Sequence, residues 1–303
     1  MRRTVRSGLV WIEALCWIAG ASPPLARSLR HPAIWGAWRA PQLRKRMLHN
    51  AGHILGPTST IAERTRLAKA VLGNFHNFLL ELSAGRHLSV DAIADKARDV
   101  QGIDHYLEAR QRGKGVIVAT AHMGDFETGI AALRAIESNI LVVFKRDELP
   151  IFERLRSAQR RRLGVVEAPI DDGLKTWLML RDALRANATV LMQADRAMPG
   201  HSGIPVKFLH AHILAPVGPA KLSLATGAPI VPVFSLRASR SVHISIEPMI
   251  VPDNGPPRSA IAQATTRLTH VIEQYVARYP DQWLALHNPW VDEAGSELSI
   301  RES

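Results

Sequence analysis

The residues best suited to chemistry lie in one short segment, in which Asp125 and Glu127 follow His122. A neutral imidazole can accept a hydroxyl proton, and a carboxylate bonded to its other nitrogen fixes the tautomer and stabilises the imidazolium that forms. Gly124 can adopt a positive φ, which allows a tight turn that brings Glu127 back toward the ring. The spacing predicts a general-base pair of His122 and Glu127, with Asp125 as a competing partner. The alternative is a structural histidine followed by a carboxylate that stabilises a helix N-terminus.

Several familiar catalytic signatures are absent from the sequence. It has no G-x-S-x-G nucleophile elbow, no phosphate-binding P-loop, no G-x-G-x-x-G after a strand and no H-E-x-x-H. Cys16 is the only cysteine, which excludes an intrachain disulfide, a cysteine-based zinc site and an iron–sulfur cluster. We therefore expect neither a metal nor a redox cofactor.

The elements that must position His122 alternate between short apolar runs and amphipathic stretches. The runs rich in valine and isoleucine are predicted strands: 115–121, 139–144, 165–168, 189–194 and 229–236. Helices are predicted over 126–137, 150–163, 171–187 and 217–226. Strands separated by helices indicate an α/β fold with a mainly parallel central sheet flanked by helices. His122 would then lie at the carboxyl edge of the sheet, where open α/β sheets bind ligands.

Further elements are predicted before and after this alternating region. Thr60 and Glu63 form a capping box that opens a helix over 59–84. A shorter helix is predicted from Ser89 to about residue 100, and another begins near Asp104. The remaining predicted elements are a strand at 241–250 that pairs at the sheet edge and a helix over 258–278.

The first 56 residues differ from the rest in charge and aromatic content. The chain has 303 residues and a net charge of +11, and its first 50 residues contain nine basic residues but only one acidic residue, Glu13. They also hold four of the seven tryptophans: Trp11, Trp17, Trp35 and Trp38. The apolar run at 8–21 is shorter than the roughly 20 residues of a membrane-spanning helix.

This pattern predicts a helical, membrane-associating segment at 1–56 that lies on an anionic membrane surface, followed by an α/β domain at 57–303. A buried N-terminal helix and a cleaved signal peptide are the alternatives. Because the basic excess is concentrated beside tryptophans, we expect anionic lipid rather than nucleic acid as the polyanionic partner.

Residues 113–127 resemble the first sequence block of the lipid A late acyltransferase family, in which a glycine-rich strand leads into H-x-G-N-W-E/D. Asp125 and Phe126 stand where that family commonly has Asn and Trp. Further blocks agree in order and spacing: 141–146, 193–209, 218–232 and 279–283. The resemblance covers more than half of the chain and departs from the family pattern after Trp283.

This resemblance implies an O-acyltransferase that moves a fatty acyl chain from acyl carrier protein or coenzyme A to a hydroxyl of a membrane glycolipid, such as a lipid A precursor. It implies that His122 is the base and that Glu127 orients it. Arg146 is implied to bind phosphate, and Asp195 to orient Arg146 or an acceptor hydroxyl. Arg196 and Lys207 are weaker candidates for phosphate contacts. The implied location is the cytoplasmic face of a bacterial inner membrane.

Other functions remain open at this point. The same dyad occurs in lysophospholipid and glycerol-phosphate acyltransferases, although it normally ends in aspartate there, and the family includes phosphatidylinositol mannoside acyltransferases. A basic helix at 154–162 has the charge to dock an acidic carrier protein or is simply solvated. The non-enzymatic alternative is a peripheral protein that binds anionic lipid through its N-terminus.

Overall fold

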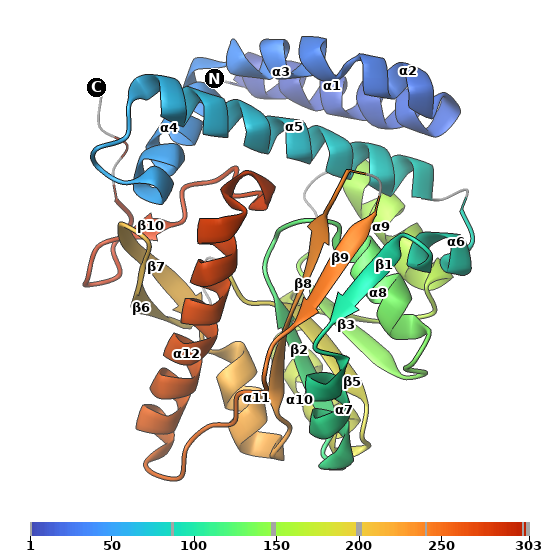
Figure 1. Cartoon of the computed structure of the whole chain (residues 1–303), viewed down its shortest axis with the longest axis vertical. Coiled ribbons are helices and arrows are strands. Elements are labelled where there is room, and N and C mark those ends of the chain that lie inside the picture. Colours follow the sequence, from blue (N-terminus) through green and yellow to red (C-terminus); the bar gives the residue numbers. More distant parts are fainter. Residues whose placement is uncertain are drawn as a thin grey trace.

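The computed structural model describes residues 2–85, 88–146, 150–197, 202–239, 241–298 and 300. Five helices form its N-terminal part: α1 (Arg2–Ala21), α2 (Pro23–Ser28), α3 (Arg30–Trp38), α4 (Pro41–Leu55) and α5 (Ile61–Gly85). The first three lie along α5, which separates them from the α/β part of the molecule (Figure 1). The predicted helical N-terminus is therefore an outer layer of the fold.

The central sheet has seven strands in the order β1-β9-β8-β2-β5-β3-β4. Their bounds are β1 (Ala97–Gln101), β2 (Val116–Thr120), β3 (Ile140–Phe144), β4 (Val166–Pro169), β5 (Thr189–Gln193), β8 (Ile230–Arg237) and β9 (Val242–Ile246). Neighbouring strands are parallel except for β8 and β9, which are antiparallel. The predicted mainly parallel α/β sheet is confirmed.

Each face of the sheet is covered by its own hydrophobic cluster. Val116 and Val118 of β2 belong to one cluster, whereas Ile117 and Ala119 belong to the other, as the two-residue period of a strand requires. The covering helices are α6 (Val90–Ala94), α7 (Ile103–Gln111), α8 (Phe126–Arg134), α9 (Pro150–Arg162), α10 (Leu174–Arg185), α11 (Gly218–Thr226) and α12 (Pro257–Arg278). Since β2 is buried on both faces, its own side chains belong to the core, and a ligand can meet only residues beyond the ends of the strand.

A second, three-stranded sheet lies beside the first and was not predicted. It consists of β6 (Gly203–Phe208), β7 (Ala211–Pro216) and β10 (Trp290–Val291), all antiparallel. Two short 3-10 helices, η1 (Ile170–Asp172) and η2 (Pro280–Gln282), complete the described elements. The small sheet brings the C-terminal segment back across the molecule.

The predicted helix from Ser89 to residue 100 is wrong. Ser89 does cap α6, but this helix ends at Ala94, and residues 97–101 form the edge strand β1. Four of its five residues are exposed, so the strand lacks the apolar run that marks the buried strands. As a consequence β9, predicted at the edge, lies one strand inside it.

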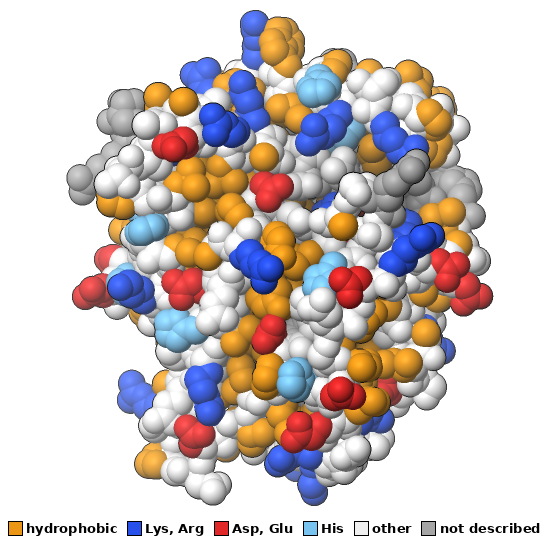
Figure 2. All heavy atoms as spheres, viewed as in Figure 1, with side chains coloured by type: hydrophobic (Ala, Val, Ile, Leu, Met, Phe, Trp, Pro, Cys, Tyr) orange, Lys and Arg blue, Asp and Glu red, His pale blue; other side chains and the backbone are white. Residues whose placement is uncertain are grey.

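The N-terminal helices combine exposed tryptophan with basic side chains. Trp17 and Trp35 are 73% and 62% exposed, and the guanidinium carbon of Arg39 lies 4.1 Å from the centroid of a Trp35 ring. Figure 2 shows blue and orange side chains together at the top of the molecule, where these helices lie. The side chain of Trp11 lies outside the described residues. In the described part of the chain, none of the helices has the length and apolarity needed to cross a bilayer.

Candidate active site

The sheet register brings His122 and Asp195 together. Thr120 ends β2 and pairs with Gln193, which ends the neighbouring parallel strand β5. His122 and Asp195 each lie two residues beyond these partners and therefore meet at the carboxyl edge. The Nδ1 atom of His122 is 2.7 Å from Oδ1 of Asp195, and the backbone N–H of His122 donates to the same oxygen at 3.2 Å.

A buried tryptophan holds the other oxygen of Asp195. The indole Nε1–H of Trp283 donates to Oδ2 at 2.9 Å, and both side chains are buried. Burial opposes ionisation of Asp195, but the adjacent His122 ring and these hydrogen bonds hold the pKa of the carboxyl group well below its usual value. Asp195 is therefore a carboxylate at neutral pH and accepts a hydrogen bond from Nδ1–H of His122.

The electrostatics favour a neutral imidazole on His122. Burial lowers the pKa of His122 below its ordinary value of 6.5, while Asp195 acts in the opposite direction. Because Nδ1 donates to Asp195, Nε2 carries the free lone pair. The side chain is 23% exposed, so this nitrogen belongs to a ring that a ligand can reach.

Glu127 does not occupy the position that the sequence analysis expected. Among the described residues, no hydrogen bond joins Glu127 to His122, and the buried Oε2 of Glu127 lacks a hydrogen-bond partner. The carboxylate on the imidazole is Asp195 instead. Burial raises the pKa of Glu127 to about 7, with the positive charge of Arg156 opposing this effect.

The turn after His122 explains why Glu127 points elsewhere. Gly124 has φ of 65°, and the N–H of Asp125 donates to the carbonyl oxygen of Ser235 on β8 at 2.8 Å. A Cβ on Gly124 would lie 1.8 Å from that oxygen, so this position requires glycine. The chain thus turns toward β8 on one side of β2, whereas β5 and Asp195 lie on the other side.

Asp125, the competing partner, has a structural role. It is the N-cap residue of α8, and its Oδ1 accepts a hydrogen bond from the N–H of Thr128 at 3.1 Å. Its Oδ2 accepts a second bond from the Thr128 hydroxyl at 2.8 Å. Both oxygens are therefore engaged in starting the helix that follows the site.

The C-terminal segment closes around the same turn. Gly124 N–H donates to the carbonyl of Gln282 at 3.2 Å, and Leu284 N–H donates to the carbonyl of His122 at 2.8 Å. The C-terminal segment is itself held by α4, since the side-chain amide of Asn50 donates to the carbonyls of Ala285 and His287 at 2.8 and 2.7 Å. The backbone of His122 is thereby fixed by segments that are distant in sequence.

A cavity of about 700 Å³ lies beside His122. Its walls come from the carboxyl ends of β3 and β5, from α9 and α10, and from the start of α11. The buried apolar side chains among them include Leu180, Met192, Val217 and Leu222. The cationic side chains that line it are Lys145, Arg146, Arg156, Arg196 and Lys221. The cavity has the size of a small-molecule site and the surfaces to accept an apolar chain joined to an anionic group.

Arg146 and Arg196 both line this cavity but differ in their partners. Arg146 is half exposed and makes a bidentate pair with Asp172, at 2.7 and 3.3 Å. Asp195 does not orient it, contrary to one of the two expected roles of that residue. The guanidinium of Arg196 lies 2.7 Å from Nδ1 of His287. Burial and the neighbouring Arg196 lower the pKa of His287 to about 3, so His287 is neutral and accepts this bond.

Lys207 is not brought to the cavity. It lies on β6 opposite His212 of β7, is exposed, and is not among the lining residues. Trp283 and His287, in contrast, contribute to the site without having been predicted to do so. Trp283 lies in a block that carries the family resemblance, which was the available signal, whereas His287 lies where the resemblance ends. Pro199 and Gly200 of the same resemblance lie outside the described residues.

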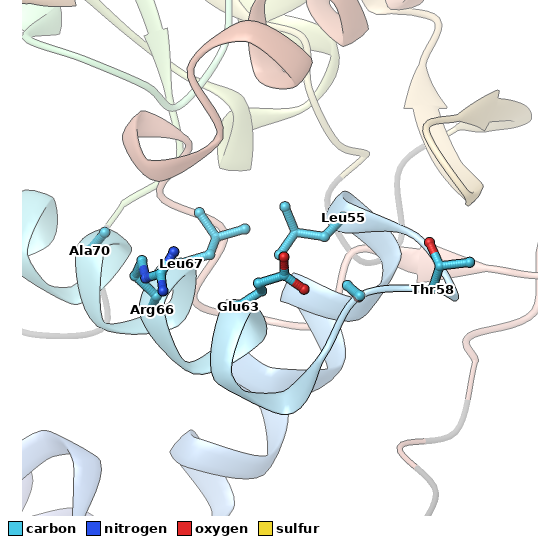
Figure 3. A pocket seen from close by; sticks show the side chains of 7 residues that line it. Leu55, Thr58, Glu63, Arg66, Leu67 and Ala70 are labelled. Atoms are coloured by element: carbon cyan, nitrogen blue, oxygen red, sulfur yellow. The ribbon is translucent and has the colours of Figure 1, made fainter.

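A second cavity, of about 510 Å³, lies at the turn between α4 and α5 and contains none of the predicted site residues (Figure 3). Glu63 on its wall accepts a hydrogen bond from the N–H of Thr60 at 2.7 Å, which is the predicted capping box. Within the described ranges, no three His, Cys, Asp or Glu side chains group as metal ligands.

Comparisons with known proteins identify the family of this chain. The model of the bacterial lipid A biosynthesis acyltransferase family matches residues 2–291. A phosphatidylinositol mannoside acyltransferase of Mycolicibacterium smegmatis is 27% identical over 204 residues, which are 67% of this chain and 66% of that protein. A phosphatidylinositol mannoside acyltransferase of Mycobacterium tuberculosis is 25% identical over 253 residues, 82% of this chain and 77% of that protein. The chain thus spans just under two thirds of the first of these relatives.

Proposed function

The chain belongs to the bacterial lipid A biosynthesis acyltransferase family, and we propose that it transfers a fatty acyl group from a thioester to a hydroxyl group of a membrane glycolipid. The observation that supports this function is the imidazole of His122, held by the buried carboxylate of Asp195 at the wall of an apolar cavity that also carries cations. Family membership counts against the non-enzymatic lipid-binding alternative.

In the proposed reaction His122 is the general base. Its Nε2 takes the proton of the acceptor hydroxyl as the oxygen attacks the thioester carbonyl, and Asp195 stabilises the imidazolium that forms. The tetrahedral intermediate then expels the thiolate, which takes the proton from Nε2. One ester and one thiol are formed, and no acyl-enzyme is required. General-base catalysis of this kind contributes about 10²–10⁴ in rate.

The cavity has distinct surfaces for the two ends of an acyl donor. The apolar wall around Leu180, Met192 and Leu222 suits the acyl chain, and the cations suit phosphate on either substrate. Arg196 is the stronger phosphate candidate, because it is partly buried, its hydrogen-bond partner His287 is neutral, and of the described residues only the nearby Asp195 carboxylate offsets its charge. Arg146 already pairs with Asp172. Either coenzyme A or acyl carrier protein can present the thioester.

The acceptor is a phosphate-bearing glycolipid. The activity of the two relatives, which acylate phosphatidylinositol mannoside, favours a mannosylated phosphatidylinositol as acceptor, whereas membership of the lipid A biosynthesis acyltransferase family favours a lipid A precursor. The exposed Trp17 and Trp35 and the basic residues around them would hold the enzyme on the anionic cytoplasmic face of a bacterial inner membrane.

The test is a reconstituted transfer assay. The purified chain is incubated with palmitoyl-coenzyme A or palmitoyl acyl carrier protein and with either phosphatidylinositol mannoside or a lipid A precursor in detergent, and products are identified by mass spectrometry. We expect an acceptor that gains one acyl group with the wild-type chain but not with His122→Ala. Equal acylation by the His122→Ala variant, with unchanged folding by circular dichroism, contradicts the proposal.

A further inference from the structure

Gly218 is the first residue of α11 and lines the cavity beside His122. It follows β7 through the buried Val217 and precedes Pro219, which is also buried. The cavity wall around it includes the apolar Met192 and Leu222 together with Lys221. Gly218 therefore lies in the part of the cavity that suits a hydrocarbon chain.

The missing side chain of Gly218 leaves open space in this wall. A Cβ built on Gly218 would have one atom within 4 Å, Cε of Met192 at 3.9 Å. At Gly203 on the neighbouring small sheet, by contrast, a Cβ would lie 2.6 Å from Leu214. Met192 is 7% exposed and is itself part of the cavity wall. A Cβ at position 218 would thus meet no close contact outside its own helix and chain neighbours, and we expect a larger side chain to extend beside Met192 into the cavity.

We propose, on the basis of the acyl transfer proposed above, that Gly218 is a specificity-determining residue: together with Met192 it sets the length of the acyl chain that the cavity accepts. The volume of the cavity limits the length of the acyl chain. Each methylene group that does not fit stays unburied or forces the protein or the ligand to shift. In a hydrophobic pocket one methylene already discriminates by about tenfold or more.

A second reason for glycine at this position must be separated from the first. A residue before proline is disfavoured in the helical region because its Cβ and N–H clash with the proline ring, and glycine has no Cβ. Gly218→Ala introduces that backbone cost with little added volume, whereas Gly218→Leu introduces the same cost and a side chain that reaches into the cavity. Comparison of the two variants therefore isolates the effect of cavity volume.

The experiment measures binding and transfer across a series of donors. Lauroyl, myristoyl, palmitoyl and stearoyl chains are presented on coenzyme A and, in parallel, on acyl carrier protein to the wild-type chain and to Gly218→Ala, Gly218→Leu and Met192→Ala. Ala225→Leu is the matched control, because Ala225 is an exposed residue of α11 outside the cavity wall. Binding is read by thermal shift, and transfer by mass spectrometry of the acylated glycolipid.

We expect Gly218→Leu to bind and transfer the longest chain accepted by the wild type at least about tenfold less well, while the shortest accepted chain changes by less than about threefold. Met192→Ala should shift the preference toward longer chains, and combining it with Gly218→Leu should partly restore the wild-type profile. Gly218→Ala should shift the profile less than Gly218→Leu does, and Ala225→Leu should keep the wild-type profile.

An unchanged chain-length profile in Gly218→Leu, or an equal shift in Gly218→Ala, overturns the assignment of Gly218 while leaving acyl transfer intact. A uniform loss for all chains in a folded Gly218→Leu protein also overturns it. If the wild-type protein binds none of the donors and transfers none of their acyl groups, the proposed function itself fails. The two failures are therefore distinguishable.

Discussion

Nδ1 of His122 lies 2.7 Å from Oδ1 of Asp195, although the two residues are 73 positions apart in the chain. The contact follows from the register of two parallel strands: Thr120 pairs with Gln193, and each functional residue comes two positions later. Strand pairing thus determines the distance between the two side chains, and the buried Trp283 fixes the carboxylate from its other side. The pair is preorganised, which is what proton abstraction from a hydroxyl group requires.

The pH dependence of transfer should report the neutral form of His122. Because burial lowers the pKa of His122 below 6.5, the fraction of free base rises with pH and is complete near neutrality. We expect log kcat/KM to rise with a slope of about one and to level off with a midpoint below pH 6.5. A steady-state pH profile checks this. A midpoint above pH 8 would show that another group controls the rate.

Trp283→Phe should impair transfer without unfolding the protein. The substitution keeps an aromatic ring in the core but removes the N–H that Asp195 accepts, and a hydrogen bond to a charged group is worth about 1.5–3 kcal/mol. We expect kcat/KM to fall by about tenfold or more, and the midpoint of the pH profile to shift.

Trp290→Phe is the matched control for this variant. Trp290 packs 5.8 Å from Trp283, ring centroid to centroid, and is equally buried, but its indole N–H donates to Asn50 instead. If both variants lose the same activity and the same stability, Trp283 acts through packing and does not position Asp195.

Glu127→Gln should change stability in a pH-dependent way. Burial raises the pKa of Glu127 from 4.5 to about 7, so its charged form is disfavoured in the folded state. The contribution of Glu127 to the free energy of unfolding therefore decreases as pH rises from about 4.5, and it is lost once the pH passes the folded-state pKa of about 7.

Glutamine cannot ionise and should remove this loss, making the variant more stable than wild type at pH 8 by about 1–3 kcal/mol relative to their difference at pH 4. Urea unfolding of both proteins at the two pH values measures the effect. An identical pH dependence in the two proteins would mean that Glu127 titrates normally, with its charge fully compensated by Arg156 and Arg160.

Trp17→Ser and Trp35→Ser should weaken membrane binding and leave the fold intact, since both side chains are largely exposed. Indole contributes affinity at the headgroup level of a bilayer. We expect the double variant to bind vesicles of phosphatidylglycerol and phosphatidylethanolamine at least about tenfold less tightly in a flotation assay. Ile136→Ser removes an apolar residue that is 55% exposed away from these helices and serves as the control. Equal binding by all variants would mean that α1–α3 do not contact the membrane.

Much of this site could be predicted from the sequence, because its signals are local. The apolar run before His122 predicts a strand, and the residues after it predict a turn into a helix, which placed His122 at the carboxyl edge of the sheet. Asp195 was recognised as a site residue through its sequence block. The hydrogen bond between Asp195 and His122 was not predicted, because local spacing favours Glu127 as the partner of the imidazole. The contact between Asp195 and His122 depends on β2 and β5 being neighbours in the sheet.

Strand order is a long-range property that hydrophobic periodicity does not contain. This limit also explains why His287, in a segment without regular structure, was not connected with Arg196. Other elements were missed for local reasons. The exposed residues of β1 lack the apolar run of a buried strand and were predicted as the end of the helix that begins at Ser89. The β6–β7 hairpin was missed because its alternation is interrupted by Pro205 and Pro216.

The most direct test of the account compares two carboxylates in one assay. Single-turnover acyl transfer to phosphatidylinositol mannoside or to a lipid A precursor is measured for Asp195→Asn and Glu127→Gln at pH 7, with folding verified by circular dichroism. The hydrogen bond between Asp195 and His122 predicts that Asp195→Asn slows transfer by about 10²–10⁴, whereas Glu127→Gln changes it by less than about tenfold. A larger loss in Glu127→Gln than in Asp195→Asn would contradict the assignment of Asp195 as the partner of the catalytic base.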